Sequence, residues 1–288
     1  MKHFYLISTE HLEDALWFRD DDDFTVGMNY VAIEAFIHNG VFILAFILMS
    51  NHVHFVLYGE KEDAVRFVND LKRRYSHYYQ LKYGIKQLLN ENDLDVELIP
   101  LEGENLERAL AYVLMNCVVA GICLHPSQYP WGSGNVYFKP VKSQGSCLSD
   151  YSKRSLRKIL HSAESLPGNW IIGDRSFILP DNYVKTASVE QRFRSPQRMD
   201  YFIRNSSKAK KRLSSEYNLP AFTDQTIFKA LPELLRSLFQ KNSFSELTRD
   251  EQTECLRQIR YRFSADLTQA ARACGITYSE AANLIDKV

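Results

Sequence analysis

Two histidines stand one residue apart in the apolar segment MSNHVHFVLY, at positions 52 and 54. Successive side chains of a strand point to opposite faces, so His52 and His54 would project from the same face. Two imidazoles on one face can share one divalent ion with oxygen ligands, as Mn²⁺, Zn²⁺ or, less readily, Mg²⁺ accepts. The alternative is a pair of partly exposed strand histidines with hydrogen-bonded rings, and the pair alone does not decide between the two.

A tyrosine and an asparagine form a second group of residues that could take part in catalysis. Tyr112 and Asn116 are four residues apart in the segment AYVLMNCVVAGI, so on a helix they would share a face. A tyrosine hydroxyl can attack phosphorus once a metal neutralises the phosphodiester oxygens, and an asparagine carbonyl can complete the coordination of that metal. With the histidines, these residue types suit phosphoryl transfer. Ordinary helix packing of Tyr112 and a capping role of Asn116 are the structural alternatives.

The elements that would position these side chains follow from the hydrophobic pattern of the front part of the chain. Alternation between turn residues predicts strands, and apolar residues at helical spacing predict helices. We expect strands over residues 3–9, 41–48, 52–58 and 96–102, helices over 24–40, 62–84 and 105–122, and a loop over the acidic run 20–23. The order β-α-β-β-α-β-α indicates an α+β fold: a ferredoxin-like antiparallel sheet with helices on one face.

The rest of the chain differs from this front part in its residue pattern and composition. Residues 249–263, 267–275 and 278–288 read as helices, and the last two are joined by a short turn as in a helix-turn-helix. We therefore expect three parts: a domain over 1–139 that carries the histidines and the tyrosine, a basic connecting region over 140–220, and a helical, helix-turn-helix-like domain over 221–288.

Charge is distributed unevenly although the formal net charge is zero. Residues 1–139 hold 11 Lys and Arg against 19 Asp and Glu, and the remainder holds 24 against 16. A basic half suits a polyanion such as nucleic acid, and a solvated basic face is the alternative. Tyr75, Tyr78 and Tyr79 could stack unpaired bases, or belong to the core. The candidate DNA-binding cations are Lys72, Arg73, Arg74, Arg192, Arg194, Arg198, Lys208, Lys210 and Lys211.

Composition and cysteine spacing exclude several protein classes. The chain is 45% hydrophobic and 24% charged, which is typical of soluble globular proteins. Its longest apolar runs fall short of the ~20 residues that a membrane span requires. The five cysteines are widely spaced and form no CxxC pair, so they indicate neither a disulfide framework nor a zinc knuckle. We expect a cytoplasmic protein with no membrane partner.

The segment LMSNHVHFVL resembles the Pro-Asn-His-hydrophobe-His signature of the HUH single-tyrosine transposases, in particular the REP-associated tyrosine transposases and their insertion-sequence relatives. The segment YVLMNCVVAGICLHPSQYPWGS is similar to the family's tyrosine helix and the Tyr-Pro-Trp-Ser segment after it, and the resemblance covers roughly residues 1–132. It implies His52, His54 and Asn116 as ligands of Mg²⁺ or Mn²⁺. It also implies Tyr112 as the nucleophile that becomes 5′-phosphotyrosyl-linked to single-stranded DNA.

We therefore expect a transposase-like strand transferase that cleaves and rejoins single-stranded or hairpin DNA without ATP. The sequence departs from the resemblance at Cys117 and Val119, where proline and arginine are usual, and its front part is acidic. These departures favour an alternative: a DNA-binding or regulatory protein that keeps the fold with weak or no cleavage. A metal-dependent phosphoesterase is a third hypothesis, but the sequence offers it no water-activating base. Homodimer formation stays open.

Overall fold

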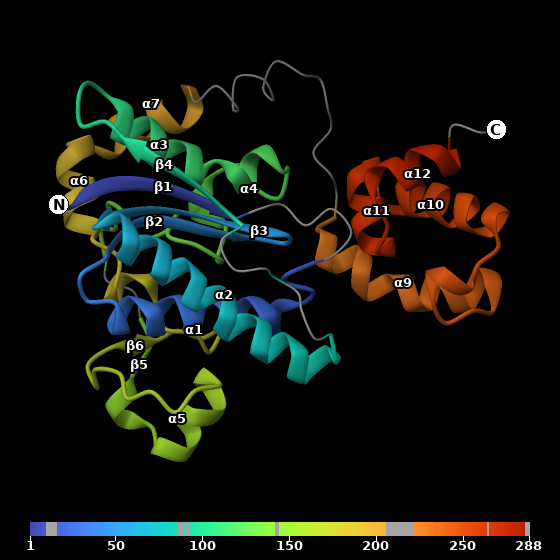
Figure 1. The fold of residues 1–288 in the computed structure, drawn as a ribbon, viewed down its shortest axis with the longest axis horizontal. Coiled ribbons are helices and arrows are strands. Elements are labelled where there is room, and N and C mark those ends of the chain that lie inside the picture. The colour runs from blue at the N-terminus through green and yellow to red at the C-terminus, as the bar shows by residue number, and fades with distance from the viewer. Residues whose placement is uncertain are drawn as a thin grey trace.

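The computed structural model describes residues 1–9, 16–85, 89, 93–141, 144–205, 222–263 and 265–285. Its front part contains a sheet between helices (Figure 1). The elements are β1 His3–Thr9, α1 Asp21–Ile37, β2 Phe42–Met49, β3 His52–Gly59, α2 Lys61–Tyr83, β4 Leu94–Ile99, α3 Asn105–Leu114 and α4 Asn116–Val119. The expected order of strands and helices is confirmed, and β1, β2 and β3 agree with their expected ranges to within a residue.

The four strands form one antiparallel sheet in the order β2-β3-β1-β4. The two crossover helices, α1 and α2, each join strands that are separated in the sheet by one other strand, as in a split β-α-β arrangement. β3 is therefore an interior strand, and His54 lies opposite Ser8 of β1 and Ile47 of β2. The α+β class and the antiparallel sheet are confirmed.

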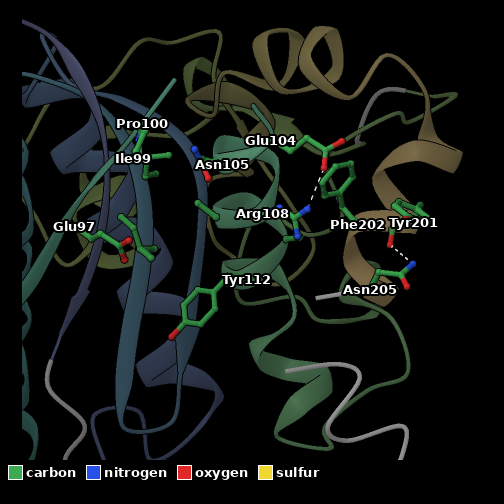
Figure 2. Close-up of a pocket in the computed structure, with 13 residues that line it drawn as sticks. Glu97, Ile99, Pro100, Glu104, Asn105, Arg108, Tyr112, Tyr201, Phe202 and Asn205 are labelled. Carbon is green, nitrogen blue, oxygen red and sulfur yellow. Dashed lines mark hydrogen bonds and ion pairs between the residues drawn. The ribbon is translucent and has the colours of Figure 1, made fainter. Parts of the chain in front are cut away.

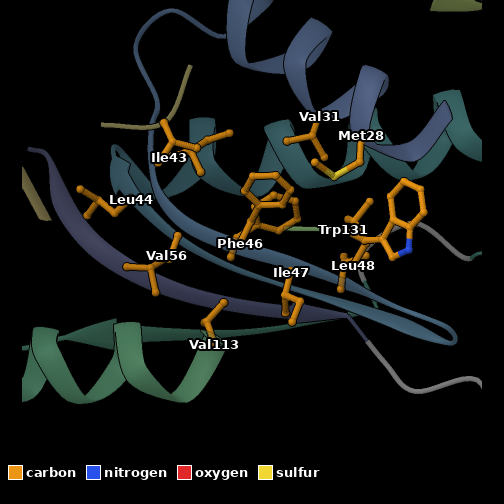
Figure 3. Packing of buried hydrophobic residues seen from close by; sticks show 14 of the residues in the cluster. Met28, Val31, Ile43, Leu44, Phe46, Ile47, Leu48, Val56, Val113 and Trp131 are labelled. Carbon is orange, nitrogen blue, oxygen red and sulfur yellow. The ribbon is translucent and has the colours of Figure 1, made fainter. Parts of the chain in front are cut away.

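The helices cover both faces of the sheet, so the expectation that they lie on one face is wrong. The Phe55 ring packs 5.5 Å from the ring of Phe67 on α2, whereas the ring of its neighbour His54 packs 5.6 Å from that of Tyr112 on α3. Because adjacent strand residues point to opposite faces, α2 and α3 must lie on opposite sides. Figure 3 shows the same division, with the α1 core residues above the sheet and Val113 of α3 below it. The third helix could not be assigned to a face from its sequence, since both faces of the sheet are apolar.

The acidic run at the start of α1 belongs to the helix, contrary to the loop that we expected. Asp20 is the N-cap and its carboxylate accepts a hydrogen bond from the backbone N–H of Asp23. Carboxylates at a helix N-terminus satisfy unpaired N–H groups and oppose the helix dipole favourably. The second crossover helix, α2, ends at Gly84 as expected. The φ of Gly84 is 74°, a left-handed conformation that glycine adopts without strain.

The helix that carries Tyr112 is interrupted, where we expected one continuous helix over 105–122. α3 ends at Leu114 and α4 begins at Asn116. The side-chain Nδ2 of Asn116 donates to the backbone carbonyls of Tyr112, at 2.9 Å, and Val113, at 3.1 Å. A carboxamide that takes carbonyls in this way competes with the backbone N–H groups for them, which gives a physical reason for the break.

The remaining described elements are mostly helical. They are the 3₁₀ turns Pro126–Gln128, Leu148–Asp150, Pro180–Asn182 and Phe244–Glu246, the short strands β5 Ser146–Cys147 and β6 Ile171–Ile172, and the helices α5 Lys153–Leu160, α6 Thr186–Phe193, α7 Pro196–Asn205, α9 Asp224–Phe239, α10 Arg249–Phe263, α11 Leu267–Cys274 and α12 Tyr278–Ile285. The three helices expected near the C-terminus are present, and α9 adds a helix that the sequence did not predict.

Two hydrophobic cores organise these elements. The first extends from the sheet to Phe202 and Ile203 of α7, so α5, α6 and α7 pack with the sheet. The second joins α9 to α12 around Leu256 and Ile259. The expected division at residues 139 and 220 stays a prediction. Among the described residues, no helix combines the length and the apolar composition that a membrane crossing requires.

Candidate active site

The two histidines lie on the face of β3 that α3 covers. Their rings are 4.7 Å apart, centroid to centroid, and meet edge to face. His52 is 7% exposed and His54 is 1% exposed, so both imidazoles are buried rather than displayed on a strand surface. The expectation that they share a face is confirmed. The alternative of partly exposed histidines with hydrogen-bonded rings is wrong about the exposure, but the hydrogen bonds to the rings are present.

Each histidine ring is oriented by a polar neighbour through its Nδ1 atom. His52 Nδ1 lies 2.9 Å from Asn51 Oδ1, and His54 Nδ1 lies 2.6 Å from Ser8 Oγ. An amide oxygen only accepts hydrogen bonds, so Nδ1 of His52 carries the proton and Nε2 of the neutral ring keeps its lone pair. A hydroxyl can also accept, which allows the same tautomer in His54. Metal-binding histidines are held in this way by a second group, so the donor set fits a divalent ion.

Tyr112 reaches the histidines from α3. Its ring packs edge-on against that of His54 with 5.6 Å between centroids, and the side chain is half-buried. Figure 2 shows the hydroxyl pointing from α3 toward the sheet. The same tyrosine lines a pocket of about 640 Å³ between β4, α3 and α7, here called the Tyr112 pocket. Its lining includes Glu97, Ile99, Asn105, Arg108, Tyr112 and Tyr201.

Asn116 follows Tyr112 by about one helical turn and is 7% exposed. Both of its described hydrogen bonds run from Nδ2 to carbonyls of α3, which identifies Oδ1 as the end of the carboxamide that faces away from those carbonyls. The capping alternative is therefore realised in part. Because these hydrogen bonds go to α3 and not to the histidines, the ligand role of Asn116 stays a prediction.

The candidate DNA-binding cations on α2 are buried or form ion pairs with other residues of the protein. Lys72 is only 3% exposed, so it is not the surface cation that its place among the DNA-binding candidates requires. Arg74 Nε lies 2.6 Å from Glu34 Oε1 of α1, which is buried. Arg73 is exposed, although its guanidinium pairs with Asp70 at 2.7 Å. Lys72 lies about one helical turn from Val68 and from Tyr75, which are both buried, so it belongs to the buried face of α2.

The three tyrosines beside these cations are core residues and not stacking surfaces. Tyr75, Tyr78 and Tyr79 are 1%, 8% and 0% exposed, and their hydroxyls donate to groups inside the fold. Burial raises the pKa of Tyr79 to about 12, although Arg19 beside it acts in the opposite direction. The hypothesis that they stack DNA bases is therefore wrong, because a base could reach none of the three rings.

The cations of the middle region have divided roles. Arg192 Nε lies 3.1 Å from Glu107 Oε2, and Arg198 Nη2 lies 3.4 Å from Glu107 Oε1, so both arginines bind α6 and α7 to the tyrosine helix. Arg194 is exposed. Lys208, Lys210 and Lys211 lie outside the described residues. Contact of any of these six side chains with DNA stays a prediction.

A second group of metal-type ligands was missed by the sequence reasoning. His38 Nε2 lies 3.4 Å from Glu34 Oε2 and 3.0 Å from Asp70 Oδ2, across α1 and α2. The spacing of four between Glu34 and His38 in a helix could have indicated it. Arg73 and Arg74 bind the other carboxylate oxygens, so the group forms an ion-pair network between two helices.

Neither a family model nor a curated protein sequence matches this chain. Among solved structures, the chain is similar to a REP-associated tyrosine transposase bound to a REP hairpin, with a TM-score of 0.38 and 12% sequence identity. The similarity covers 58% of this chain and 90% of that one. A likeness of this size establishes neither family nor function, so the functional argument depends on the residues themselves.

Proposed function

We propose that this chain is a metal-dependent DNA strand transferase in which Tyr112 is the nucleophile and single-stranded or hairpin DNA is the substrate. One observation carries the proposal: the Tyr112 ring packs against His54, and His54 packs against His52. A phenol and two imidazoles are thus gathered on one face of the sheet, and Tyr112 itself lines an open pocket. That combination suits nucleophilic attack on a metal-bound phosphodiester.

The residues have separable roles in this proposal. His52, His54 and Asn116 would hold the divalent ion, Mg²⁺ or Mn²⁺, which supplies positive charge to the phosphodiester oxygens as negative charge develops there. Asn51 and Ser8 fix the orientation of the two imidazoles through Nδ1. The Tyr112 oxygen attacks phosphorus, the bond from phosphorus to the 3′ oxygen breaks, and the phenol proton goes to that leaving oxygen. The number of phosphoester bonds is unchanged, so the reverse attack by a 3′ hydroxyl rejoins the strand.

The Tyr112 pocket gives a strand access to the nucleophile. α3 forms its floor, and β4 and α7 form its sides (Figure 2). Tyr201 of α7 is 62% exposed there, and an exposed aromatic ring is a surface on which an unpaired base stacks. Glu104 at the rim is neutralised by Arg108, at 3.2 Å, and Arg198, at 3.4 Å. Single-stranded DNA therefore fits this pocket better than duplex DNA, whose bases are already stacked.

The decisive experiment is a search for the covalent intermediate. The protein is incubated with hairpin oligonucleotides that carry 5′ single-stranded extensions, in Mg²⁺ or Mn²⁺, and separated on a denaturing gel. We expect a protein–DNA adduct that requires the metal and is lost in Tyr112→Phe. The matched control is Tyr201→Phe, which removes another hydroxyl from the same pocket and should leave the adduct in place. An adduct that persists in Tyr112→Phe would refute the assignment of the nucleophile.

A DNA-binding protein without useful cleavage is the second candidate. It is favoured by the commitment of Arg192 and Arg198 to ion pairs with Glu107, which leaves few described cations near Tyr112 to hold a scissile phosphate. Fluorescence anisotropy with the same oligonucleotides separates the two functions. Tight binding without any adduct, across both metals and a range of hairpins, would support this candidate over the strand transferase.

A further inference from the structure

The C-terminal helices contact the front part of the fold at the turn that precedes His52. Ser50 and Asn51 form this two-residue turn between β2 and β3. The hydroxyl of Ser50 donates to Oδ2 of Asp224, the first residue of α9, at 2.5 Å. Ser50 is 7% exposed and Asp224 is 6% exposed. A buried, charge-assisted hydrogen bond therefore joins α9 to the turn.

Asp224 is held in place by α11. Gln269 Nε2 donates to Asp224 Oδ1 at 3.1 Å, and Arg272 Nε donates to Asp224 Oδ2 at 3.1 Å. The Arg272 side chain is only 16% exposed. A buried carboxylate with a cation and two further donors is fixed in both position and orientation, so it can fix the hydroxyl that it binds.

The turn is held on its other side by the backbone and leads directly to the first histidine. The N–H groups of Trp17 and Phe18 donate to the Ser50 carbonyl at 2.8 Å and 3.1 Å. The next residue, Asn51, accepts from His52 Nδ1 at 2.9 Å. A continuous series of hydrogen bonds and one peptide bond thus connects Asp224 to the imidazole of His52.

Docking of the helices does not depend on Asp224 alone. Gln225, the next residue, donates from Nε2 to the carbonyl of Phe18 at 2.9 Å. Arg19 also lies 5.5 Å from the centre of the Phe228 ring of α9. These contacts join the same two parts of the protein without touching the Ser50 hydroxyl. If Asp224 served only for docking, its replacement should have the same effect on His52 as the replacement of Gln225.

We infer that Asp224 is a positioning residue for the histidine pair: through Ser50 it fixes the turn from which Asn51 orients His52. The front part of the chain then lacks one determinant of its own site, and the C-terminal helices supply it. That the oriented His52 serves to bind a metal ion rests on the proposed function. That Asp224 orients His52 does not.

The test uses the full chain with ¹⁵N-labelled histidine, without DNA and without metal. In the wild type, the ring nitrogens of His52 should report one tautomer with the proton on Nδ1. In Asp224→Ala and in Ser50→Ala, the His52 signals should move toward a mixture of the two tautomers. In Gln225→Ala, which removes a contact across the same junction, they should stay as in the wild type. Asp224→Asn, which keeps an acceptor for Ser50, should restore most of the wild-type signal.

Calorimetric titration with Mn²⁺ alone provides the second measurement. Loss of a group that orients a metal ligand typically weakens binding 10- to 100-fold, and Asp224 acts through two intervening residues. We therefore expect about tenfold weaker binding in Asp224→Ala and no change in Gln225→Ala. If Asp224→Ala does not fold, as judged by near-ultraviolet circular dichroism, Ser50→Ala carries both measurements without loss of a charge.

The possible failures are distinct. A His52 tautomer and a Mn²⁺ affinity that are the same in Asp224→Ala, Ser50→Ala and Gln225→Ala would overturn the inference, even if Tyr112 forms the adduct. Conversely, a wild type that forms no adduct, with a His52 tautomer that still follows Asp224, would end the proposed function and leave the positioning role intact.

Discussion

Glu107 connects the tyrosine helix to α6 and to α7, which forms one side of the Tyr112 pocket, and the cost of its removal can be worked out from burial. It lies on α3 with its side chain 4% exposed, between Arg192 at 3.1 Å and Arg198 at 3.4 Å. Glu107→Gln removes the negative charge while keeping the shape. The two guanidinium groups then lose their shared partner, although they remain close to the same amide.

The magnitude follows from the exposure of the three groups. Breaking a fully buried ion pair costs about 3–5 kcal/mol, and an exposed pair contributes about 0.2–1 kcal/mol. Glu107 is buried, but Arg192 and Arg198 are 35% and 41% exposed, so water can solvate the cations left behind. We expect a loss of about 2 kcal/mol in the free energy of unfolding of the sheet and the helices that share its core, α6 and α7 included. This loss is equivalent to a fall of about 4–8 °C in Tm.

The measurement is urea denaturation followed by circular dichroism, with Glu104→Gln as the matched control. Glu104 also pairs with Arg198, at 3.4 Å, but its side chain is 44% exposed. Its replacement should cost at most about 1 kcal/mol. If Glu107→Gln costs no more than Glu104→Gln, then the buried carboxylate is not the anchor of α6 and α7, and the reasoning from burial is refuted.

Three further changes test other parts of the fold. Gly132→Ala would place a methyl group 2.7 Å from the Phe46 carbonyl oxygen, so it should cost about 1–3 kcal/mol in urea denaturation, and an unchanged midpoint would contradict this packing. Burial alone would raise the pKa of Asp20, but a first-turn N–H and Lys82 lower it overall. This carboxylate therefore stabilises the fold above its unfolded pKa of about 4, and the contribution is lost as the pH falls through the lower pKa of the folded state. The wild type and Asp20→Asn should then differ in urea midpoint at pH 7 and converge in acid. A difference that stays constant with pH would contradict this role of Asp20. If the exposed Arg194 contacts a phosphate, Arg194→Gln should lower the salt dependence of DNA binding by about one ion, and an unaltered slope would remove it from the interface.

The sequence was informative where a local pattern has one structural solution. Two apolar runs on either side of the turn-prone Ser50–Asn51 pair predicted the β2–β3 hairpin, and with it the shared face of His52 and His54. Gly84 ended α2 as expected, since few other residues adopt its left-handed conformation. These features depend on neighbouring residues only, so they can be deduced before the fold is known.

Features that depend on tertiary contacts were predicted poorly. Lys72 looks like a surface cation in sequence but is buried, and Asn116 looks like a helical residue but interrupts the helix. α9 contains Pro232, and an internal proline argues against a helix unless the rest of the segment packs well. The contact of Asp224 with Ser50 joins residues 174 positions apart, and no local pattern indicates such a pair.

Charge was the least reliable guide, because the sum over a segment ignores which cations are paired. Four of the cations assigned to DNA lie buried or in ion pairs with Glu34 or Glu107: Lys72, Arg74, Arg192 and Arg198. An exposed group of cations does occur on α5, namely Lys153, Arg154, Arg157 and Lys158. α5 packs against α1, on the side of the sheet opposite α3 (Figure 1). Phosphates bound there would lie across the sheet from Tyr112, so these α5 cations cannot attract a phosphate to it. If Tyr112 is the nucleophile that we propose, attraction of the scissile phosphate would depend mainly on a divalent ion held by the histidines, and the substrate should bind far better with the metal than without it.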